Sequence, residues 1–305
     1  MAAWKTIRIT KPCTLRLDNG NLVLEDDDVQ LKFSLDDTDS IVFEGDRFTV
    51  SAKLLAALSA HKIAVLFCDA YYMPTAILHP YHKSALATRT IKAQLALPPD
   101  FAKMLWQELI RTKILLQKAV LEHLGKADKR LDRYLAQLRP GDKAGAEAKS
   151  ARIYWSRLFK GLKREPDSFD LRNQALNYAY ALIRSLITRD LSAAGFLPSL
   201  GIWHDNQYNA FNLSDDLMEP FRPIVDIGVY YILQKHQDSE YLSPDIKRDL
   251  ITLLDKEYVI FEAGLSTLRT TSKRYIHSFK RSVMSKDHTL MNYPSFDPKH
   301  LNERV

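Results

Sequence analysis

The sequence predicts an α+β fold: a small antiparallel, β-sandwich-like domain over residues 1–80, then an all-α domain over residues 86–284. Short apolar runs bounded by turn residues fill the first 80 positions, which is typical of strands. Beyond residues 79–82, helix-forming residues dominate and strand-like runs nearly vanish, so we place the domain boundary there. Residues 285–305 contain two prolines and many polar side chains, which predicts a tail.

The β domain is expected to begin with five strands, at residues 6–10, 14–17, 22–25, 29–35 and 41–44. Asn19-Gly20 lies between two of them and favours a hairpin, because a type I′ turn needs positive φ at both central positions. Residues 51–61 place leucines at helical spacing after Ser51, a suitable N-cap, and residues 63–68 return to a buried strand. One helix therefore interrupts the sheet.

The longest periodic segment is expected to be a helix over residues 100–124. It follows Pro98-Pro99 and ends at Gly125, and Leu105, Leu109 and Leu116 lie on its apolar face. Further helices are expected at residues 126–139, 146–160, 170–194, 213–236, 244–259 and 266–284.

Composition narrows the class of protein. A chain of 305 residues that is 46% hydrophobic can bury a sizeable core and is long enough for two domains. Residues 1–85 hold 9 Lys and Arg against 11 Asp and Glu, whereas the remainder holds 34 against 26, so the helical part suits a polyanion. Cys13 and Cys68 follow no metal-binding spacing, and no signal-peptide core or membrane-length apolar run occurs. We therefore expect a cytoplasmic protein with no membrane association.

Two candidate metal ligands stand at helix or loop positions that the residues alone leave open. Glu147 is either a first-turn residue favoured by the helix dipole or an inward ligand on the side of Ala151 and Tyr154. His204 lies in the polar stretch 201–209 between two helices, where it is either solvated, a cap, or a ligand placed by a loop.

The third candidate is Glu219, which shares one turn with Asp215 and Asp216. Three acids in one turn repel each other unless a cation, an arginine or the helix N-terminus relieves them. Pro220 removes a helical N–H and should kink the helix beside Glu219. Two carboxylates and one imidazole favour Mg²⁺ or Mn²⁺ over structural zinc.

Four blocks of residues together resemble a known family. They are Gly141-Asp142 with Glu147, Ala151, Tyr154 and Trp155; Arg172-Asn173 with Asn177, Tyr178 and Tyr180; His204 with Asn209 and Phe211; and Asp216 with Glu219, Pro220, Phe221 and Arg222. In this order and placement they resemble the CRISPR adaptation integrase, the Cas-one family, in its type II-like form. The resemblance covers the whole chain and is most specific over residues 141–226.

The resemblance implies the function and the site. It places the metal ligands and catalytic residues on Glu147, His204 and Glu219, with Mg²⁺ or Mn²⁺ as cofactor, and makes Asp216 an assisting acid. It implies a homodimer, with residues 1–80 as the dimerisation domain, and assembly with the small Cas-two adaptation protein. The implied activity is that of a metal-dependent DNA integrase and endonuclease, which joins the 3′-OH ends of short DNA fragments into CRISPR repeat DNA by transesterification.

Other basic residues are DNA or site candidates. Arg222 is three residues from Glu219 and either orients its carboxylate, contacts a phosphate or forms an exposed pair. The segment 266–284 is either a DNA-contacting basic helix or a solvated helix with an apolar back; its candidate DNA-binding residues are Arg269, Lys273, Arg274, Lys280 and Arg281.

Two alternatives stay open at this point. A branched-DNA repair nuclease would use the same metal site to hydrolyse with water and would form no strand-transfer product. A non-catalytic DNA-bridging protein would bind DNA regardless of a chelator, with its acids serving only as helix caps.

Overall fold

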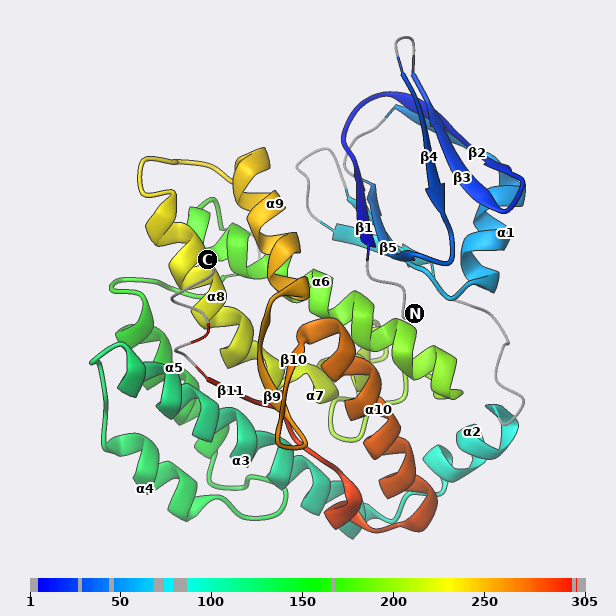
Figure 1. Ribbon diagram of the computed structural model, residues 1–305. Helices are drawn as coiled ribbons and strands as arrows, with labels where there is room; N and C mark the ends of the chain where they lie inside the picture. Colours follow the sequence, from blue (N-terminus) through cyan, green and yellow to red (C-terminus); the bar gives the residue numbers. More distant parts are fainter. Residues whose placement is uncertain are drawn as a thin grey trace.

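The computed structural model describes residues 5–26, 29–43, 47–68, 74–78, 87–165, 168–297 and 300. A strand-rich N-terminal part is followed by a helical part, which confirms the predicted order (Figure 1). The predicted boundary near residues 79–82 lies outside the described residues.

Two four-stranded sheets and one helix form the β domain, with strand orders β4-β3-β2-β6 and β1-β5-β7-β8. Asn19 and Gly20 have φ angles of 46° and 77° and close the β2–β3 hairpin, as predicted. The Ser51 side chain accepts a hydrogen bond from the Leu54 N–H and caps α1. The elements are β1 Lys5–Ile9, β2 Cys13–Asp18, β3 Asn21–Glu25, β4 Gln30–Ser34, β5 Thr38–Phe43, β6 Phe48–Val50, α1 Ala52–Ala60, β7 Ala64–Cys68 and β8 Pro74–Leu78.

The expectation of a purely antiparallel β domain is wrong. β5 pairs in parallel with both β1 and β7, and β2 pairs in parallel with β6. A parallel pair needs a crossover, and the chain between β5 and β7 provides one that contains β6 and α1. The local pattern predicted the strands, but their direction depends on these long connections.

The sheet that contains β5 and β7 lies between two hydrophobic cores. Ile41, Phe43 and Val65 belong to the core of the β domain, whereas Val42 and Leu66 belong to the core of the helical part. Successive side chains of a strand point to opposite faces, so the continuous apolar runs of these strands serve both cores. The β domain is thereby packed against α6 (Figure 1).

The two longest helices of the helical part are α3 and α6 (Figure 1). Within the described residues, no helix combines the length and apolar character needed to cross a membrane. The helices are α2 Ala87–Leu95, α3 Pro99–His123, α4 Arg130–Gln137, α5 Ala146–Leu158, α6 Leu171–Ala194, α7 Asn212–Met218, α8 Phe221–Lys235, α9 Pro244–Thr252 and α10 Leu268–Ser285, with 3₁₀ turns at Leu253–Asp255 and His288–Leu290.

The description of this part as all-α needs a correction, because it contains a small sheet of order β10-β9-β11. The helix expected over residues 244–259 ends at Thr252, and β9 Glu257–Phe261 turns through Glu262 and Ala263, both at positive φ, into β10 Gly264–Thr267. β11 Ser295–Phe296 pairs with β9. The start of the predicted tail therefore contributes a strand, since its backbone completes the edge of this sheet.

The helix expected over residues 213–236 is divided at Glu219 and Pro220 into α7 and α8. Proline has no N–H to donate to the preceding turn, which is the physical reason for the predicted kink. The division places Glu219 at the junction of two helices, 5% exposed.

Candidate functional site

Glu147 is fixed by the way in which α5 begins. Gly145 adopts φ 63° at the N-cap, and the Asp142 carboxylate accepts hydrogen bonds from the N–H groups of Ala146 (2.8 Å) and Glu147 (2.9 Å). Because Gly145, the N-cap residue, has no side chain, Asp142 supplies the hydrogen bonds that cap the helix. The first turn of α5 is held firmly enough to aim Glu147 toward α3.

Lys113 of α3 bridges the two predicted acidic ligands. Its Nζ lies 2.6 Å from Glu147 Oε1 and 2.5 Å from Glu219 Oε2, and the side chain is 8% exposed. Burial alone would lower the pKa of Lys113, but the charges of Glu219 and Glu147 outweigh burial and raise that pKa. The ammonium group is therefore charged and shared by two carboxylates.

Lys113 belongs to none of the sequence motifs that predict the site. It lies four residues after Leu109 and three before Leu116, on the apolar face of the helix. A lysine at a core position is rarely buried unless it is paired. That position in the apolar pattern was the signal that could have identified it.

Glu219 is surrounded by positive charge. Arg222 Nε donates a hydrogen bond to Glu219 Oε1 at 2.8 Å, and its guanidinium lies 4.6 Å from the centre of the Tyr180 ring. Burial alone would raise the pKa of Glu219, but Arg222 and Lys113 outweigh it and lower the pKa to about 2. Arg222 thus orients the carboxylate, one of the roles expected for it.

His204 is held by Asp216. The Asp216 carboxylate accepts hydrogen bonds from the N–H groups of Ile202 (2.6 Å), Trp203 (2.9 Å) and His204 (3.2 Å), and its Oδ1 lies 2.6 Å from His204 Nδ1. The hydrogen bond to Asp216 raises the pKa of His204. In the neutral ring, an Nδ1–H that donates to a carboxylate leaves Nε2 with its lone pair for a ligand.

Gly201 allows the loop to wrap around Asp216. A Cβ at this position would lie 2.2 Å from the His204 carbonyl oxygen and 2.9 Å from Asp216 Oδ2. Both distances are far below van der Waals contact, so only glycine fits this close approach. The loop, Asp216 and His204 therefore form one unit.

A cavity of about 260 Å³ opens beside Lys113, Glu147 and Glu219. Its wall includes Asp226, whose pKa is raised to about 7 by burial, and Tyr180, whose hydroxyl donates to Asp226 Oδ1 at 2.5 Å. The cavity is lined by Lys113, Gln117, Glu147, Ala151, Trp155, Arg164, Tyr180, Glu219, Arg222 and Asp226.

Arg164 is the third arginine or lysine of this wall. It donates hydrogen bonds to Asn173 Oδ1 and, at 2.9 Å, to Asn177 Oδ1. The two asparagines, which belong to the second of the four motif blocks, therefore hold a cationic side chain at the cavity.

The structure brings Glu147 and Glu219 together through Lys113 and joins His204 to Asp216. Among the described residues, no three His, Cys, Asp or Glu side chains converge closely enough to hold a metal ion. The donor set nevertheless fits a hard divalent cation, because two carboxylates already face one shared positive charge. Glu219 Oε2 is also buried without a directed hydrogen bond in the described structure, so its contact with Lys113 is an ion pair only.

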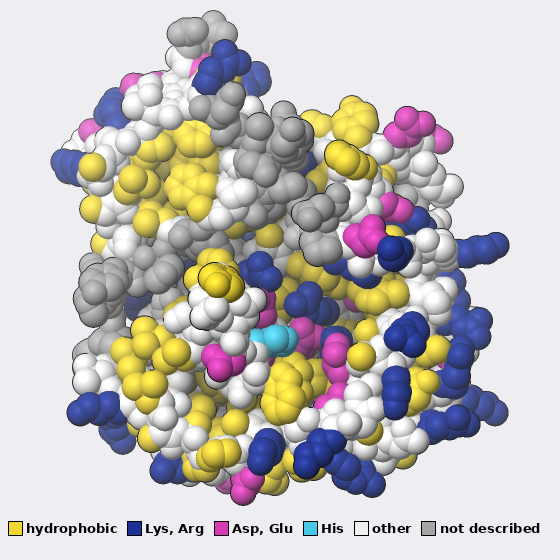
Figure 2. Space-filling view, turned by 180° about the vertical axis from the view of Figure 1, so that it is seen from behind, with side chains coloured by type: hydrophobic (Ala, Val, Ile, Leu, Met, Phe, Trp, Pro, Cys, Tyr) yellow, Lys and Arg dark blue, Asp and Glu magenta, His cyan; other side chains and the backbone are white. Residues whose placement is uncertain are grey.

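Figure 2 shows a hollow on one face of the helical part in which acidic, basic and histidine side chains meet. The sequence motifs do not include three of the charged residues that line the cavity beside Glu147 and Glu219: Lys113, Arg164 and Asp226.

The five basic candidates of α10 separate into different environments. Arg269 is buried, and its guanidinium binds Asp255 (2.6 Å) and Ser40 (3.0 Å), which corrects its assignment to DNA: it ties α10 to the β domain. Arg274 pairs with Glu262, and Lys280 Nζ donates to the Ala194 carbonyl at 2.7 Å. Lys273 and Arg281 are exposed.

Comparison with known protein families shows which family this chain belongs to. A family model described as "CRISPR associated protein Cas1" matches residues 7–245. The chain belongs to the Cas1 family. The CRISPR-associated endonuclease Cas1 of Neisseria meningitidis is 32% identical over 297 residues, which are 97% of this Cas1 chain and 97% of the relative. A Cas1 endonuclease of Francisella tularensis subsp. novicida is 26% identical over 289 residues, covering 88% and 86% of the two chains.

Solved structures share the Cas1 fold. A casposase bound to its integration product superposes with a TM-score of 0.77 at 19% identity, over 92% of this chain and 91% of the casposase. A Cas1 protein from Thermotoga maritima gives 0.75 at 17% identity, over 92% and 97%. A chain of a Cas6-RT-Cas1–Cas2 complex gives 0.75 at 18% identity, over 96% of this chain and 36% of that one. These likenesses establish the α+β architecture of the described residues.

Proposed function

We propose that this Cas1-family protein is a metal-dependent DNA integrase and endonuclease of CRISPR adaptation. It joins the 3′-OH ends of short DNA fragments into repeat DNA by transesterification. The observation that carries the proposal is the shared cation: Glu147 and Glu219 come from different helices, yet one buried ammonium lies within 2.6 Å of both. Two carboxylates that already share one cation, the Lys113 ammonium, are suited to bind a metal cation in its place.

Glu147, His204 and Glu219 would hold the metal, Mg²⁺ or Mn²⁺. When bound, such an ion polarises a phosphodiester and activates a hydroxyl nucleophile. Asp216 keeps the imidazole of His204 in one orientation, and Arg222 keeps one Glu219 oxygen in place. A bound metal would take the place of the Lys113 ammonium between the two carboxylates, and Lys113, which lines the same cavity, would then be available to a phosphate.

Three further features belong to this proposal. The type II-like subgroup is proposed on the resemblance of the four motif blocks, which include Glu219. DNA and the Cas2 protein are the proposed partners, supported by similar folds in a casposase bound to its integration product and in a Cas6-RT-Cas1–Cas2 complex. The cytoplasm is the proposed location.

A homodimer through the β domain is supported by an exposed edge. β4 is the outer strand of its sheet, and Leu31 within it and Val29 just before it are each 45% exposed. An apolar edge strand favours pairing with another chain. We expect Leu31→Glu to shift the protein from dimer to monomer in sedimentation-velocity experiments, whereas Lys32→Glu, the neighbouring change, should shift it less. A wild-type monomer at micromolar concentration would contradict the dimer.

The function is tested by joining a labelled DNA 3′ end into a repeat-bearing plasmid with Mn²⁺ or Mg²⁺. Glu147→Ala, His204→Ala and Glu219→Ala should each reduce joining by at least ~100-fold, because each removes a donor to the metal. Glu122→Ala is a matched control: Glu122 is a partly exposed residue of α3 that pairs only loosely, at 3.7 Å, with Lys118. Unchanged joining by any of the three variants would remove that residue from the metal site.

The same assay separates the two rival functions. A nuclease that only hydrolyses would cleave DNA without forming strand-transfer products. A non-catalytic DNA-bridging protein would bind DNA equally well with or without EDTA and would be indifferent to Glu147→Ala.

A further inference from the structure

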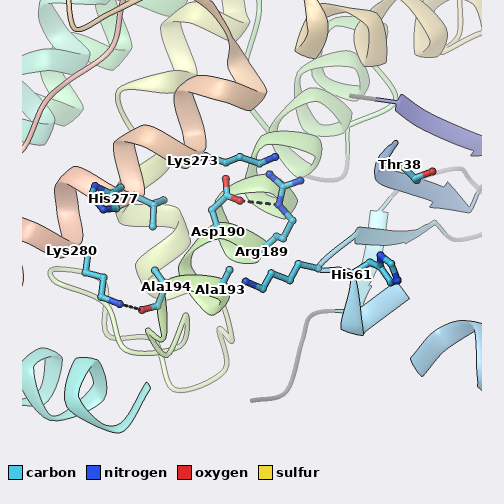
Figure 3. A pocket seen from close by; sticks show the side chains of 11 residues that line it. Thr38, His61, Arg189, Asp190, Ala193, Ala194, Lys273, His277 and Lys280 are labelled. Atoms are coloured by element: carbon cyan, nitrogen blue, oxygen red, sulfur yellow. Dashed lines mark hydrogen bonds and ion pairs between the residues drawn. The ribbon is translucent and has the colours of Figure 1, made fainter. Parts of the chain in front are cut away.

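A second charged cavity lies between the β domain and the helices α6 and α10 (Figure 3). Its volume is about 470 Å³, which falls within the roughly 300–1,000 Å³ range of small-ligand pockets. Thr38 of β5 and His61 after α1 stand on one side, and the last turns of α6 and one face of α10 stand on the other. Neither Glu147, His204 nor Glu219 belongs to its lining.

The lining of this interdomain pocket is strongly basic. It contains one acidic residue, Asp190, against four cationic residues: Lys62, Arg189, Lys273 and Lys280. With the histidines neutral, the formal charge of the lining is therefore +3.

Asp190, the single acidic residue of the lining, already accepts hydrogen bonds from other side chains of the protein. Arg189 Nε donates to Asp190 Oδ1 at 2.8 Å (Figure 3). Ser272 Oγ donates to Asp190 Oδ2 at 2.6 Å. The carboxylate thus offsets the buried guanidinium of Arg189, and the three lysines keep the cavity positive. Partial burial also lowers the pKa of Lys280, so the pocket holds a cation that its surroundings disfavour. A bound anion would relieve that cost.

Three residues of α10 line this pocket. Lys273, His277 and Lys280 follow each other at i, i+4 and i+7. Arg274 and Arg281 lie on the neighbouring face, where they line a smaller hollow together with Lys273 and His277, and Arg274 pairs there with Glu262. The pocket is therefore lined by basic side chains of α10 and by Lys62 of the β domain.

We propose that this interdomain pocket binds the phosphate of one nucleotide unit, supplied either by a DNA strand or by a free nucleotide. Lysine and arginine side chains recognise phosphate oxygens through charge-assisted hydrogen bonds. Because the walls come from both parts of the chain, a ligand there stabilises the arrangement of the β domain on the helices. Only the DNA-strand source rests on the proposed function.

The test measures binding without divalent metal, in EDTA at low salt. The probes are thymidine monophosphate, followed by calorimetry, and a fluorescein-labelled ten-residue thymidine strand, followed by anisotropy. Lys62→Asn removes one charge of the pocket at a left-handed backbone position (φ 60°) that asparagine tolerates. Lys286→Asn is the matched control: it makes the same change at φ 53° on an exposed residue outside the pocket.

We expect Lys62→Asn to weaken binding of at least one probe by roughly 5- to 10-fold, about the effect of one charge-assisted contact, and Lys286→Asn to leave it unchanged. A second pair, Lys273→Gln and the exposed α1 control Lys53→Gln, should behave in the same way. Binding of the monophosphate identifies a free nucleotide as sufficient, whereas an effect on the strand alone identifies DNA as the source.

The proposal is overturned if both pocket variants bind both probes as tightly as their controls. Glu147→Ala should retain this binding while losing joining. Loss of joining by the metal-site variants therefore tests the proposed function, and loss of probe binding by the pocket variants tests this inference separately.

Discussion

Two charged regions lie along helix α6 and differ in their balance of charge. At the candidate active site near Tyr180, cationic side chains and carboxylates line the same cavity, and Lys113 pairs with both Glu147 and Glu219. At the end of α6, the interdomain pocket holds four cations and the single acid Asp190. Cations in direct contact with Glu219 keep this buried carboxylate charged, so that a metal can replace an ammonium, whereas a cluster with an excess of cations attracts an anion.

Removing Lys113 is the strongest way to break the balance of the first region. Lys113→Met leaves the buried Glu219 and the partly exposed Glu147 near each other without their shared cation. Because Glu147 is 34% exposed and Glu219 keeps Arg222, we expect a cost of about 3 kcal/mol in the metal-free protein's unfolding free energy, the lower end of the range for breaking a buried pair. The same change removes the ammonium that competes with the metal. We therefore expect Mn²⁺ to bind roughly 10-fold more tightly by calorimetry, which equals about 1.4 kcal/mol.

Lys103→Met is the matched control on α3, since Lys103 is exposed and pairs with exposed Asp100. Weaker Mn²⁺ binding by Lys113→Met would mean that the lysine supports the metal rather than competing with it.

The buried carboxyl group of Asp226, in the first region, should make the stability of the protein depend on pH. Its pKa is raised by burial from 3.8 to about 7, so the folded state binds more protons than the unfolded state between these values. The wild type should therefore lose stability as pH rises through that window. Asp226→Asn removes this dependence, and its stability relative to wild type should increase by about 2–3 kcal/mol from pH 5 to pH 8.

Urea unfolding at both pH values measures this difference. The control is Asp245→Asn, a substitution of an exposed residue that pairs with exposed Arg248. A wild-type-minus-variant difference that does not change with pH would show that Asp226 is already charged at pH 5.

The smallest expected effect on stability concerns the loop that holds His204. Gly201→Ala places a Cβ against the His204 carbonyl and Asp216, and should cost about 1–3 kcal/mol as the loop shifts. Because His204 and Asp216 move together, strand joining and the pKa of His204 measured by NMR should both fall, while nucleotide binding in the interdomain pocket stays the same. Gly264→Ala serves as the control, because an added Cβ there meets only the Phe261 carbonyl oxygen at an ordinary contact distance of 3.7 Å. A wild-type His204 pKa in Gly201→Ala would contradict this coupling.

The sequence was sufficient where the signal lies within a few residues. The Asn19-Gly20 hairpin, the Ser51 cap and the break at Pro220 were all predictable, because turns, caps and proline act on adjacent backbone. The blocks around Glu147, His204 and Glu219 also identified the family from the sequence. Strand direction was not predictable, since β5 and β7 pair across a connection that includes β6 and α1.

Tertiary structure alone decided which charged side chains meet. Lys113 and Glu147 are 34 positions apart, and the Arg269 contact with Ser40 spans 229 positions. Helix periodicity places Arg269 and Lys273 in the same basic segment, but packing buries the first against the β domain and turns the second toward a cavity. The sequence by itself determined most of the helices, the family and the identity of the candidate acidic ligands. Folding determined their partners, because the pairing of a charge depends on which distant element shares its buried surroundings.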